Sequence, residues 1–163
     1  GGGEDAAGAT ADLDAAVAAY VAANERAPRL AVVYYNLAVA LERRGGGAAP
    51  ARRAAIEAYR TGLRLDPSDA AGWCNLGAAL LRSAGSSDGE GEQRRARCNE
   101  AITAFREAAR LAPRDADAHY NLGVALQRAG RDAEAVAPLR TAMRCRHAGG
   151  KAGGGPAGGP RRP

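Results

Sequence analysis

Aromatic side chains are scarce in this sequence, which holds one Trp, one Phe and five Tyr among 163 residues. Alanine dominates instead, with 42 copies. Because small side chains bury little area each, a core must come from many close contacts between Ala and Leu. Alanine is the strongest helix former, whereas β-branched residues, which favour strands, are few. The composition therefore predicts an all-α protein.

Long apolar runs, metal-ligand patterns and catalytic motifs are also absent from the sequence. No apolar run approaches the roughly 18 residues that a membrane-spanning helix needs. The three cysteines lack Cys-x-x-Cys spacing, and with only two histidines they form no zinc-ligand pattern. No glycine-rich phosphate loop, paired-carboxylate site or nucleophile constellation is visible. We therefore expect no enzymatic activity, no metal and no cofactor in this chain, which could still be part of a larger enzyme.

Positive charge exceeds negative charge by five, and the 23 basic residues include a single lysine. Three of the arginines, Arg94, Arg95 and Arg97, cluster at the start of one predicted helix. Neighbouring glutamates can pair with them along that helix, and no aromatic residues are interleaved as in nucleic-acid readers. A nucleic-acid partner is therefore disfavoured. The odd cysteine count favours a reducing compartment, and no signal peptide is visible, so we expect an intracellular, cytoplasmic or nuclear location, with organelles left open.

Three stretches of the sequence read alike and indicate an internal repeat. Each begins with a bulky ring and continues through Asn-Leu and a small residue to another Leu; they are Tyr34–Leu41, Trp73–Leu80 and His119–Leu126. Each is followed by a second helical pattern with small and large residues in matching order; these are Ala55–Leu65, Ala101–Leu111 and Ala135–Met143. Pro67 and Pro113 stop two of these second helices, and Asp115 can cap the helix that follows.

The first two units are longer than the third because each has an insertion between its two helices. We place the insertions at residues 45–49 and at 85–96. We expect the run of good helix formers that leads to Asn99 to lengthen the second helix of the second unit. Ahead of the first unit, one second helix stands without its partner. The predicted segments are a flexible 1–10, a lone helix at 11–27, repeats at about 31–69, 70–115 and 116–147, and a disordered Gly/Pro-rich basic tail at 148–163.

These residues resemble the tetratricopeptide repeat. Its signature has an aromatic residue, Leu-Gly and a further Leu or aromatic residue in the first helix, followed by Ala, Phe or Tyr, Ala and Pro in the second. The match covers roughly residues 14–146, with His119 as a departure at the aromatic position. The resemblance implies an α-solenoid of three antiparallel helix pairs plus one leading helix. Small residues at matching positions would let paired helices approach closely, with large residues filling the gaps.

In an array of this kind each first helix lines the inner, concave face. An asparagine recurs once per unit, and an arginine follows it seven residues later on the same helix face. A tyrosine stands beside the asparagine in two of the units. The predicted peptide-binding residues are Asn36, Asn75, Asn121, Arg43, Arg82, Arg128, Tyr35 and Tyr120. An Asn amide can pair with the backbone of an extended peptide, and the arginines would favour acidic segments; otherwise the asparagines tie neighbouring helices together and the arginines form a solvated face.

The sequence thus predicts a protein-interaction module or scaffold that holds an extended peptide segment in a concave groove. The alternative is that the chain is the substrate-recognition segment of a larger enzyme. A similar Asn ladder occurs in the tetratricopeptide segments of the glycosyltransferase that puts N-acetylglucosamine on proteins. Repeat arrays usually carry polar caps, and none is evident at either end of this one. Either the array continues in a longer protein or its ends self-associate.

Overall fold

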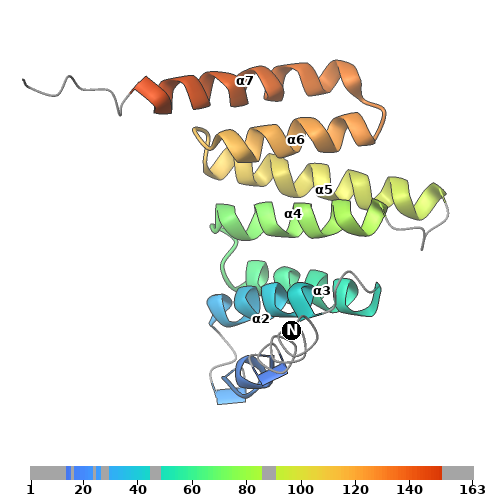
Figure 1. Cartoon of the computed structure of the whole chain (residues 1–163), viewed down its shortest axis with the longest axis vertical. Coiled ribbons are helices and arrows are strands. Elements are labelled where there is room, and N and C mark those ends of the chain that lie inside the picture. The colour runs from blue at the N-terminus through green and yellow to red at the C-terminus, as the bar shows by residue number, and fades with distance from the viewer. Residues whose placement is uncertain are drawn as a thin grey trace, which may run out of the picture.

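The computed structural model describes residues 14–15, 17–23, 25–26, 30–44, 49–85 and 91–151, and in this part of the chain it contains helices and no strands. The described residues before Arg26 are helical and precede six further helices (Figure 1). These helices are α2 (Ala31–Arg44), α3 (Ala49–Leu65), α4 (Ala70–Gly85), α5 (Gly91–Leu111), α6 (Ala116–Arg128) and α7 (Asp132–Lys151). The predicted all-α class is confirmed.

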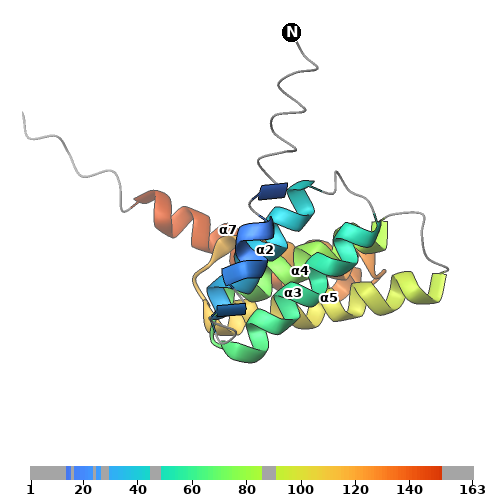
Figure 2. The same ribbon diagram turned by 90° about the horizontal axis from the view of Figure 1, so that it is seen from below.

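The helices pack as consecutive antiparallel pairs: α2 with α3, α4 with α5, and α6 with α7. The second helix of one pair contacts the first helix of the next, so α3 packs on α4 and α5 packs on α6. Figure 2 looks along the stack and shows α3, α5 and α7 pointing in different directions. Pairs that stack and turn in this way form an α-solenoid, as the repeat pattern predicts.

Two aspartates cap the helices that begin the second and third pairs. The Asp69 side chain accepts a hydrogen bond from the Ala71 amide at 2.9 Å. Asp115 is the N-cap of α6 and accepts from the amides of Asp117 and Ala118. Each cap satisfies amides at a helix start that have no partner within the helix. The predicted cap at Asp115 is confirmed, and Asp69 bonds a helix amide in the same way at the start of α4.

The third pair has a short, regular turn between its helices. Gly130 has a φ of 73°, a conformation that side chains other than Gly rarely adopt. The Gly130 amide donates to the Gln127 carbonyl and the Arg131 amide to the Leu126 carbonyl, both at 2.9 Å. This pair of bonds is the Schellman motif, which ends α6 and lets α7 fold back at once.

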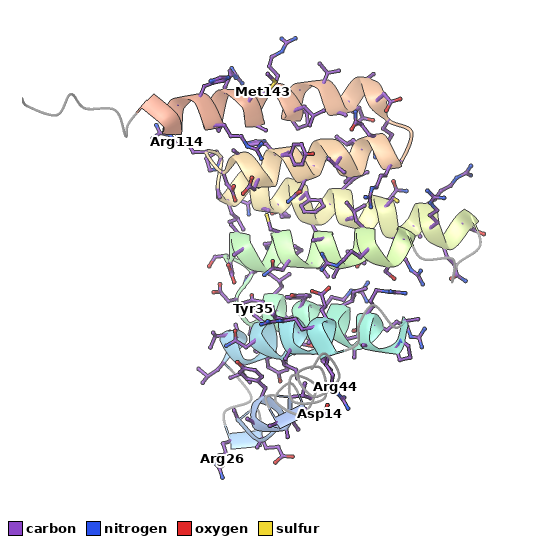
Figure 3. The ribbon with its side chains drawn as sticks, viewed as in Figure 1. Asp14, Arg26, Tyr35, Arg44, Arg114 and Met143 are labelled. Carbon is purple, nitrogen blue, oxygen red and sulfur yellow. The ribbon has the colours of Figure 1, made fainter. Side chains whose placement is uncertain are left out.

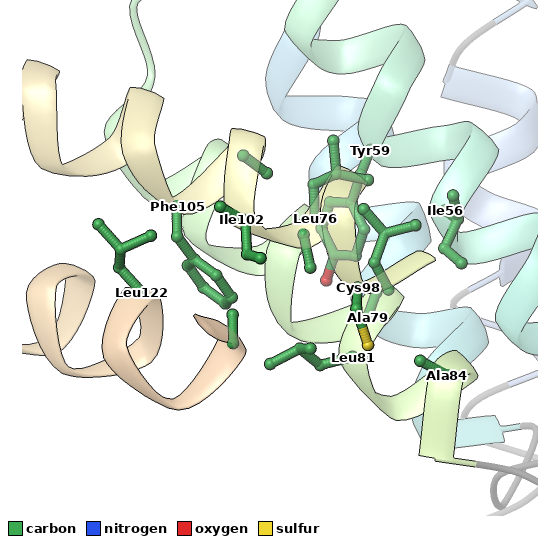
Figure 4. Close-up of a cluster of buried hydrophobic side chains, with 14 of the residues drawn as sticks. Ile56, Tyr59, Leu76, Ala79, Leu81, Ala84, Cys98, Ile102, Phe105 and Leu122 are labelled. Carbon is green, nitrogen blue, oxygen red and sulfur yellow. The ribbon is translucent and has the colours of Figure 1, made fainter. Parts of the chain in front are cut away.

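Close approach of the helices depends on glycines that face large side chains, as the repeat pattern predicts. A Cβ atom added at Gly77 of α4 would lie 2.8 Å from the Phe105 ring of α5, and one at Gly123 would overlap Leu139 of α7. The Phe105 ring is buried and lies between Ile102 and Leu122 in the core (Figure 4). Glycine therefore provides the space that each large partner fills.

The predicted segment boundaries are only partly within the described residues. α5 begins at Gly91, so the run before Asn99 extends this helix as expected. α7 continues to Lys151, past the boundary that we placed at residue 147. The predicted flexible segment 1–10, residues 45–48 of the first insertion, residues 86–90 of the second and the remainder of the predicted tail lie outside the described residues.

Candidate peptide-binding face

The first helices α2, α4 and α6 carry the predicted binding residues, and α4 also contacts α6 directly. Asn36 and Asn75 are exposed on α2 and α4, and Asn121 of α6 is half-buried. Among the described residues, no hydrogen bond involves the side-chain amide of any of the three. Each amide therefore keeps a donor and an acceptor free for another molecule.

Of the three arginines that follow the asparagines, Arg82 is ion-paired, whereas Arg43 and Arg128 have no ion pair with a described residue. Arg82 of α4 forms an ion pair with Glu42 of α2, and the Tyr59 hydroxyl donates to the other Glu42 oxygen at 3.4 Å. Arg82 thus ties one repeat to the next across the first helices. Arg43 and Arg128 are exposed, and neither makes an ion pair with any residue that the structure describes.

Arg128 also borders a cavity of about 440 Å³ at the edge of the array. Arg94 and Arg95 of α5 line the same cavity, together with Cys98, Asn99 and the turn at Gly130. No ion pair with a described residue neutralises Arg94 or Arg95. Three guanidinium groups around one hollow favour a carboxylate or another anionic group there.

Tyr35 is half-buried and packs against two other helices of the stack. Its hydroxyl donates to the Asp66 carbonyl at 3.2 Å, and its ring occupies the space above Gly62 and Gly72. A Cβ atom at Gly72 would lie 2.9 Å from the ring (Figure 3 labels Tyr35). Burial, together with the charges of Asp69 and Asp66, raises the pKa of Tyr35 to about 12. The two glycines are the sequence signal for this packing, which the position beside Asn36 did not reveal.

Tyr120 occupies the equivalent position in the third unit and is exposed on α6. The Arg146 guanidinium lies over its ring, 5.3 Å from the centroid, and donates to Asp117 at 3.0 Å. A cation over an aromatic face is an attractive contact that keeps the ring in place without burying it. Tyr120 therefore remains available for contact with a partner.

Sequence reasoning missed a hydrogen bond that joins the first helix of a unit to the preceding turn. Trp73 Nε1 donates to the Pro67 carbonyl at 3.0 Å. His119 Nε2 lies 3.0 Å from the Pro113 carbonyl, and the tautomer with a proton on Nε2 donates there. His119 thus replaces the ring N–H of Trp at the same position, six residues after a proline. This equivalence explains why the departure from the repeat pattern is tolerated.

The described residues hold no group of three or more His, Cys, Asp or Glu that could bind a metal ion. Burial raises the pKa of the Cys74 thiol to about 11, aided by the carboxylates of Asp115 and Asp117. The thiol is therefore protonated near neutral pH, whereas a reactive cysteine needs the thiolate. No helix in the described part of the chain is long and apolar enough to cross a membrane.

Comparison with known proteins agrees with this architecture. A family profile described as TPR repeat matches residues 53–83 and 97–130. The fold is similar to TTC0263, a thermophilic TPR protein of Thermus thermophilus, with a TM-score of 0.66, 22% identity, and coverage of 85% of this chain and 69% of that one. It is also similar to MamA MSR-1 C2, with a TM-score of 0.64, 17% identity, and coverage of 85% and 70%. At these identities the likeness shows the fold alone. A search among curated proteins gave no significant match.

Proposed function

We propose that this chain, whose helix pairs are tetratricopeptide repeats, is a protein-interaction module that holds an extended peptide along its first helices. The repeats and the repeat-protein neighbours support an interaction module in general. Proteins of this family are typically non-catalytic scaffolds, and we assign no reaction to the chain. The observation that carries the peptide proposal is the column of Asn36, Asn75 and Asn121, called here the asparagine column. The side-chain amides of these residues make no hydrogen bonds to the described residues.

An extended peptide presents unpaired backbone N–H and C=O groups at regular intervals along its length. An Asn side chain can donate to a C=O and accept from an N–H, so one amide can hold one residue of the peptide whatever its side chain is. Three amides on three successive first helices would hold the peptide at three places. This arrangement binds the backbone, and selectivity must come from neighbouring charged or aromatic groups.

Arg43 and Arg128 are the groups that would supply selectivity, because neither is neutralised by a described carboxylate. The further arginines around the cavity beside Arg128 strengthen the positive potential at that end of the face. We therefore propose that the favoured peptides carry acidic residues. Arg82 is assigned to the array itself, since Glu42 already pairs with it.

The experiment that tests this proposal selects ligands for the full chain from a displayed library of random peptides. The affinity of a selected peptide is then measured for Asn36→Ala/Asn75→Ala/Asn121→Ala by fluorescence anisotropy. Loss of at least one hydrogen bond at each of the three positions, each contributing about 0.5–1.5 kcal/mol, should weaken binding by at least about 10-fold. Circular dichroism verifies that the variant is folded.

The matched control is Gln93→Ala, which removes an exposed amide side chain from the second helix α5, outside the cavity beside Arg128. This variant should bind the selected peptide as tightly as the wild type. Equal affinity of the asparagine-column variant and the wild type would overturn the peptide proposal. Enrichment of acidic residues among peptides selected by the wild type, and its loss in Arg43→Gln/Arg128→Gln, would support the role of the arginines.

A further inference from the structure

The outer surface of α7 carries the apolar positions that the two preceding second helices use to pack on a following repeat. At the first of these positions Ile56 and Ile102 are 6% and 1% exposed, whereas Val136 is 54% exposed. At the second, Leu63 and Ala109 are 4% and 9% exposed, whereas Met143 is 62% exposed. The side chains of α7 thus have the character of a stacking surface, but no described residue covers them.

A third equivalent position holds an arginine in each of the three second helices, and two of these arginines form ion pairs. Arg60 of α3 pairs with Glu100 of α5, and its Nε donates at 3.1 Å. Arg106 of α5 pairs in the same way with Glu134 of α7 at 3.2 Å. Arg140 of α7 is the next member of the series and has no ion pair with a residue that the structure describes. The open surface therefore combines exposed apolar side chains with an unpaired positive charge.

The opposite end of the array carries exposed small or apolar side chains and an acidic residue. Figure 1 shows the described helical residues before Arg26 at one end of the stack and α7 at the other, and Figure 3 labels Asp14 and Met143 at these two ends. Small or apolar side chains are exposed along this first helical segment; they are Ala18, Ala19, Val21 and Ala22. Glu25 is exposed beside them.

Acidic and basic residues are concentrated at opposite ends of the sequence. Residues 1–26 contain five acidic residues and one arginine, whereas residues 139–163 contain six basic residues and no acidic one. Within the chain, Asp14 already pairs with Arg44 and Arg146 with Asp117, which leaves Glu25 at one end and Arg140 and Arg144 at the other without an ion pair to a described residue. Two α7 surfaces facing each other would bring Arg140 and Arg144 of both copies together, which like charges oppose. An α7 surface facing the first helical segment of another copy would pair opposite charges and cover apolar side chains on both sides.

We propose that the chain self-associates head to tail, with the α7 surface of one copy packed on the first helical segment (described residues 14–15, 17–23 and 25–26) of the next. Such an interface joins two different surfaces, so it produces open chains of copies or a closed ring rather than a symmetric pair. The asparagine column lies on the first helices and not on either end surface. Self-association is therefore independent of the peptide binding proposed above.

The experiment is sedimentation velocity of the full chain over a range of concentrations, with one variant for each end. Arg140→Glu/Met143→Glu alters the α7 surface, and Val21→Lys/Glu25→Lys alters the opposite end. All four side chains are exposed, so both variants should keep the wild-type helical circular dichroism. We expect the wild type to form species larger than a dimer and each variant alone to be monomeric.

An equimolar mixture of the two variants should form a one-to-one dimer and nothing larger, because each supplies only one intact end. The control Val39→Glu changes an exposed apolar residue of the first helix α2 and should associate as the wild type does. Raising sodium chloride from about 0.05 M to about 0.5 M should weaken association by about 10-fold. A monomeric wild type at every concentration would overturn the proposal. So would dimerisation of the Val21→Lys/Glu25→Lys variant alone, which would indicate a symmetric contact between α7 surfaces.

Discussion

α5 and α7 are second helices of adjacent repeats with matching residues, yet among the described residues a following pair covers α5 and not α7. In α5, Ile102 and Phe105 are buried against α4 and α6. In α7, Val136 is exposed and Leu139 is half-buried. Arg106 of α5 finds a carboxylate on the next second helix, whereas Arg140 finds none among the described residues.

The difference shows that position within the array, and not residue type, decides what a side chain contributes. The same apolar pattern forms core in α5 and a free surface in α7. In the same way, Tyr35 is packed against Gly72 of the next repeat, whereas its equivalent Tyr120 is exposed. Stability should therefore respond very differently to equivalent substitutions in the two regions.

The largest effect is expected for equivalent truncations in the two second helices. Ile102→Ala removes a buried side chain and leaves a cavity, so it should lower the free energy of unfolding by about 3 kcal/mol. Val136→Ala truncates an exposed side chain and should change it by less than about 0.5 kcal/mol. Urea unfolding, measured at a concentration where the chain is monomeric, compares them. Similar losses for both variants would show that α7 is covered in solution.

The next-largest effect on stability is expected at two glycines that face large side chains. Gly77→Ala directs a Cβ atom at the Phe105 ring, which is buried and cannot move away, and should cost about 1–3 kcal/mol. Gly123→Ala directs a Cβ atom at Leu139, which borders the open surface and can shift toward solvent. Its cost should be the smaller of the two in thermal unfolding. The reverse order would contradict the difference in coverage.

A pH dependence of stability is expected from the Tyr35 hydroxyl. The pKa of Tyr35 is raised to about 12 by burial and by the charges of Asp69 and Asp66, above the value of about 10 in an unfolded chain. A raised pKa in the folded state stabilises the fold below pH 10, and this contribution is lost as the pH rises from about 10 to about 12. Burial and Glu42 raise the pKa of Tyr59 as well, so part of the loss belongs to that residue.

The measurement is the urea midpoint at several pH values for the wild type, Tyr35→Phe and Tyr120→Phe. The alkaline loss should become smaller in Tyr35→Phe, because Phe carries no ionisable hydroxyl. It should persist in the Tyr120→Phe control, whose ring lies in solvent. Identical alkaline profiles for all three proteins would contradict the buried position of the Tyr35 hydroxyl.

The smallest effect concerns the arginines at equivalent positions of α5 and α7. Arg106→Ala removes an exposed ion pair with Glu134 and should cost about 0.2–1 kcal/mol at low salt. Arg140→Ala removes no ion pair with a described residue and should leave the stability of the monomer unchanged. Thermal unfolding at low and high salt measures both variants. An equal, salt-dependent loss in Arg140→Ala would mean that this side chain is already paired.

Much of the fold could be predicted from the sequence because the repeat pattern specifies local structure and pairing together. The recurring Asn-Leu pattern located the first helices, and Asp115 indicated the start of α6. The glycines opposite Phe105 and Leu139 were predicted as places of close approach. These signals are short-range or recur at fixed spacing, so they can be read without knowing how the pairs stack.

The functions of individual side chains were harder to predict because they depend on contacts between repeats. Arg82 and Arg128 occupy equivalent positions, but Glu42 of the preceding repeat pairs with Arg82. Tyr35 stands beside Asn36, but Gly72 of the following repeat provides the space for its ring. Such contacts join residues about 40 positions apart, and the insertions make that separation differ from one repeat to the next. The asparagine column remains a prediction that binding experiments must test.

A following repeat covers α5, whereas among the described residues none covers α7. Amide hydrogen exchange with mass spectrometry, at low and high protein concentration, tests this difference directly. At low concentration, α5 should be strongly protected and α7 should exchange fastest among the second helices α3, α5 and α7. At high concentration, protection should rise in α7 and in residues 14–26 together, with α2 and α4 unchanged. Equal protection of α5 and α7 at low concentration, or a rise confined to the first helices, would contradict the account.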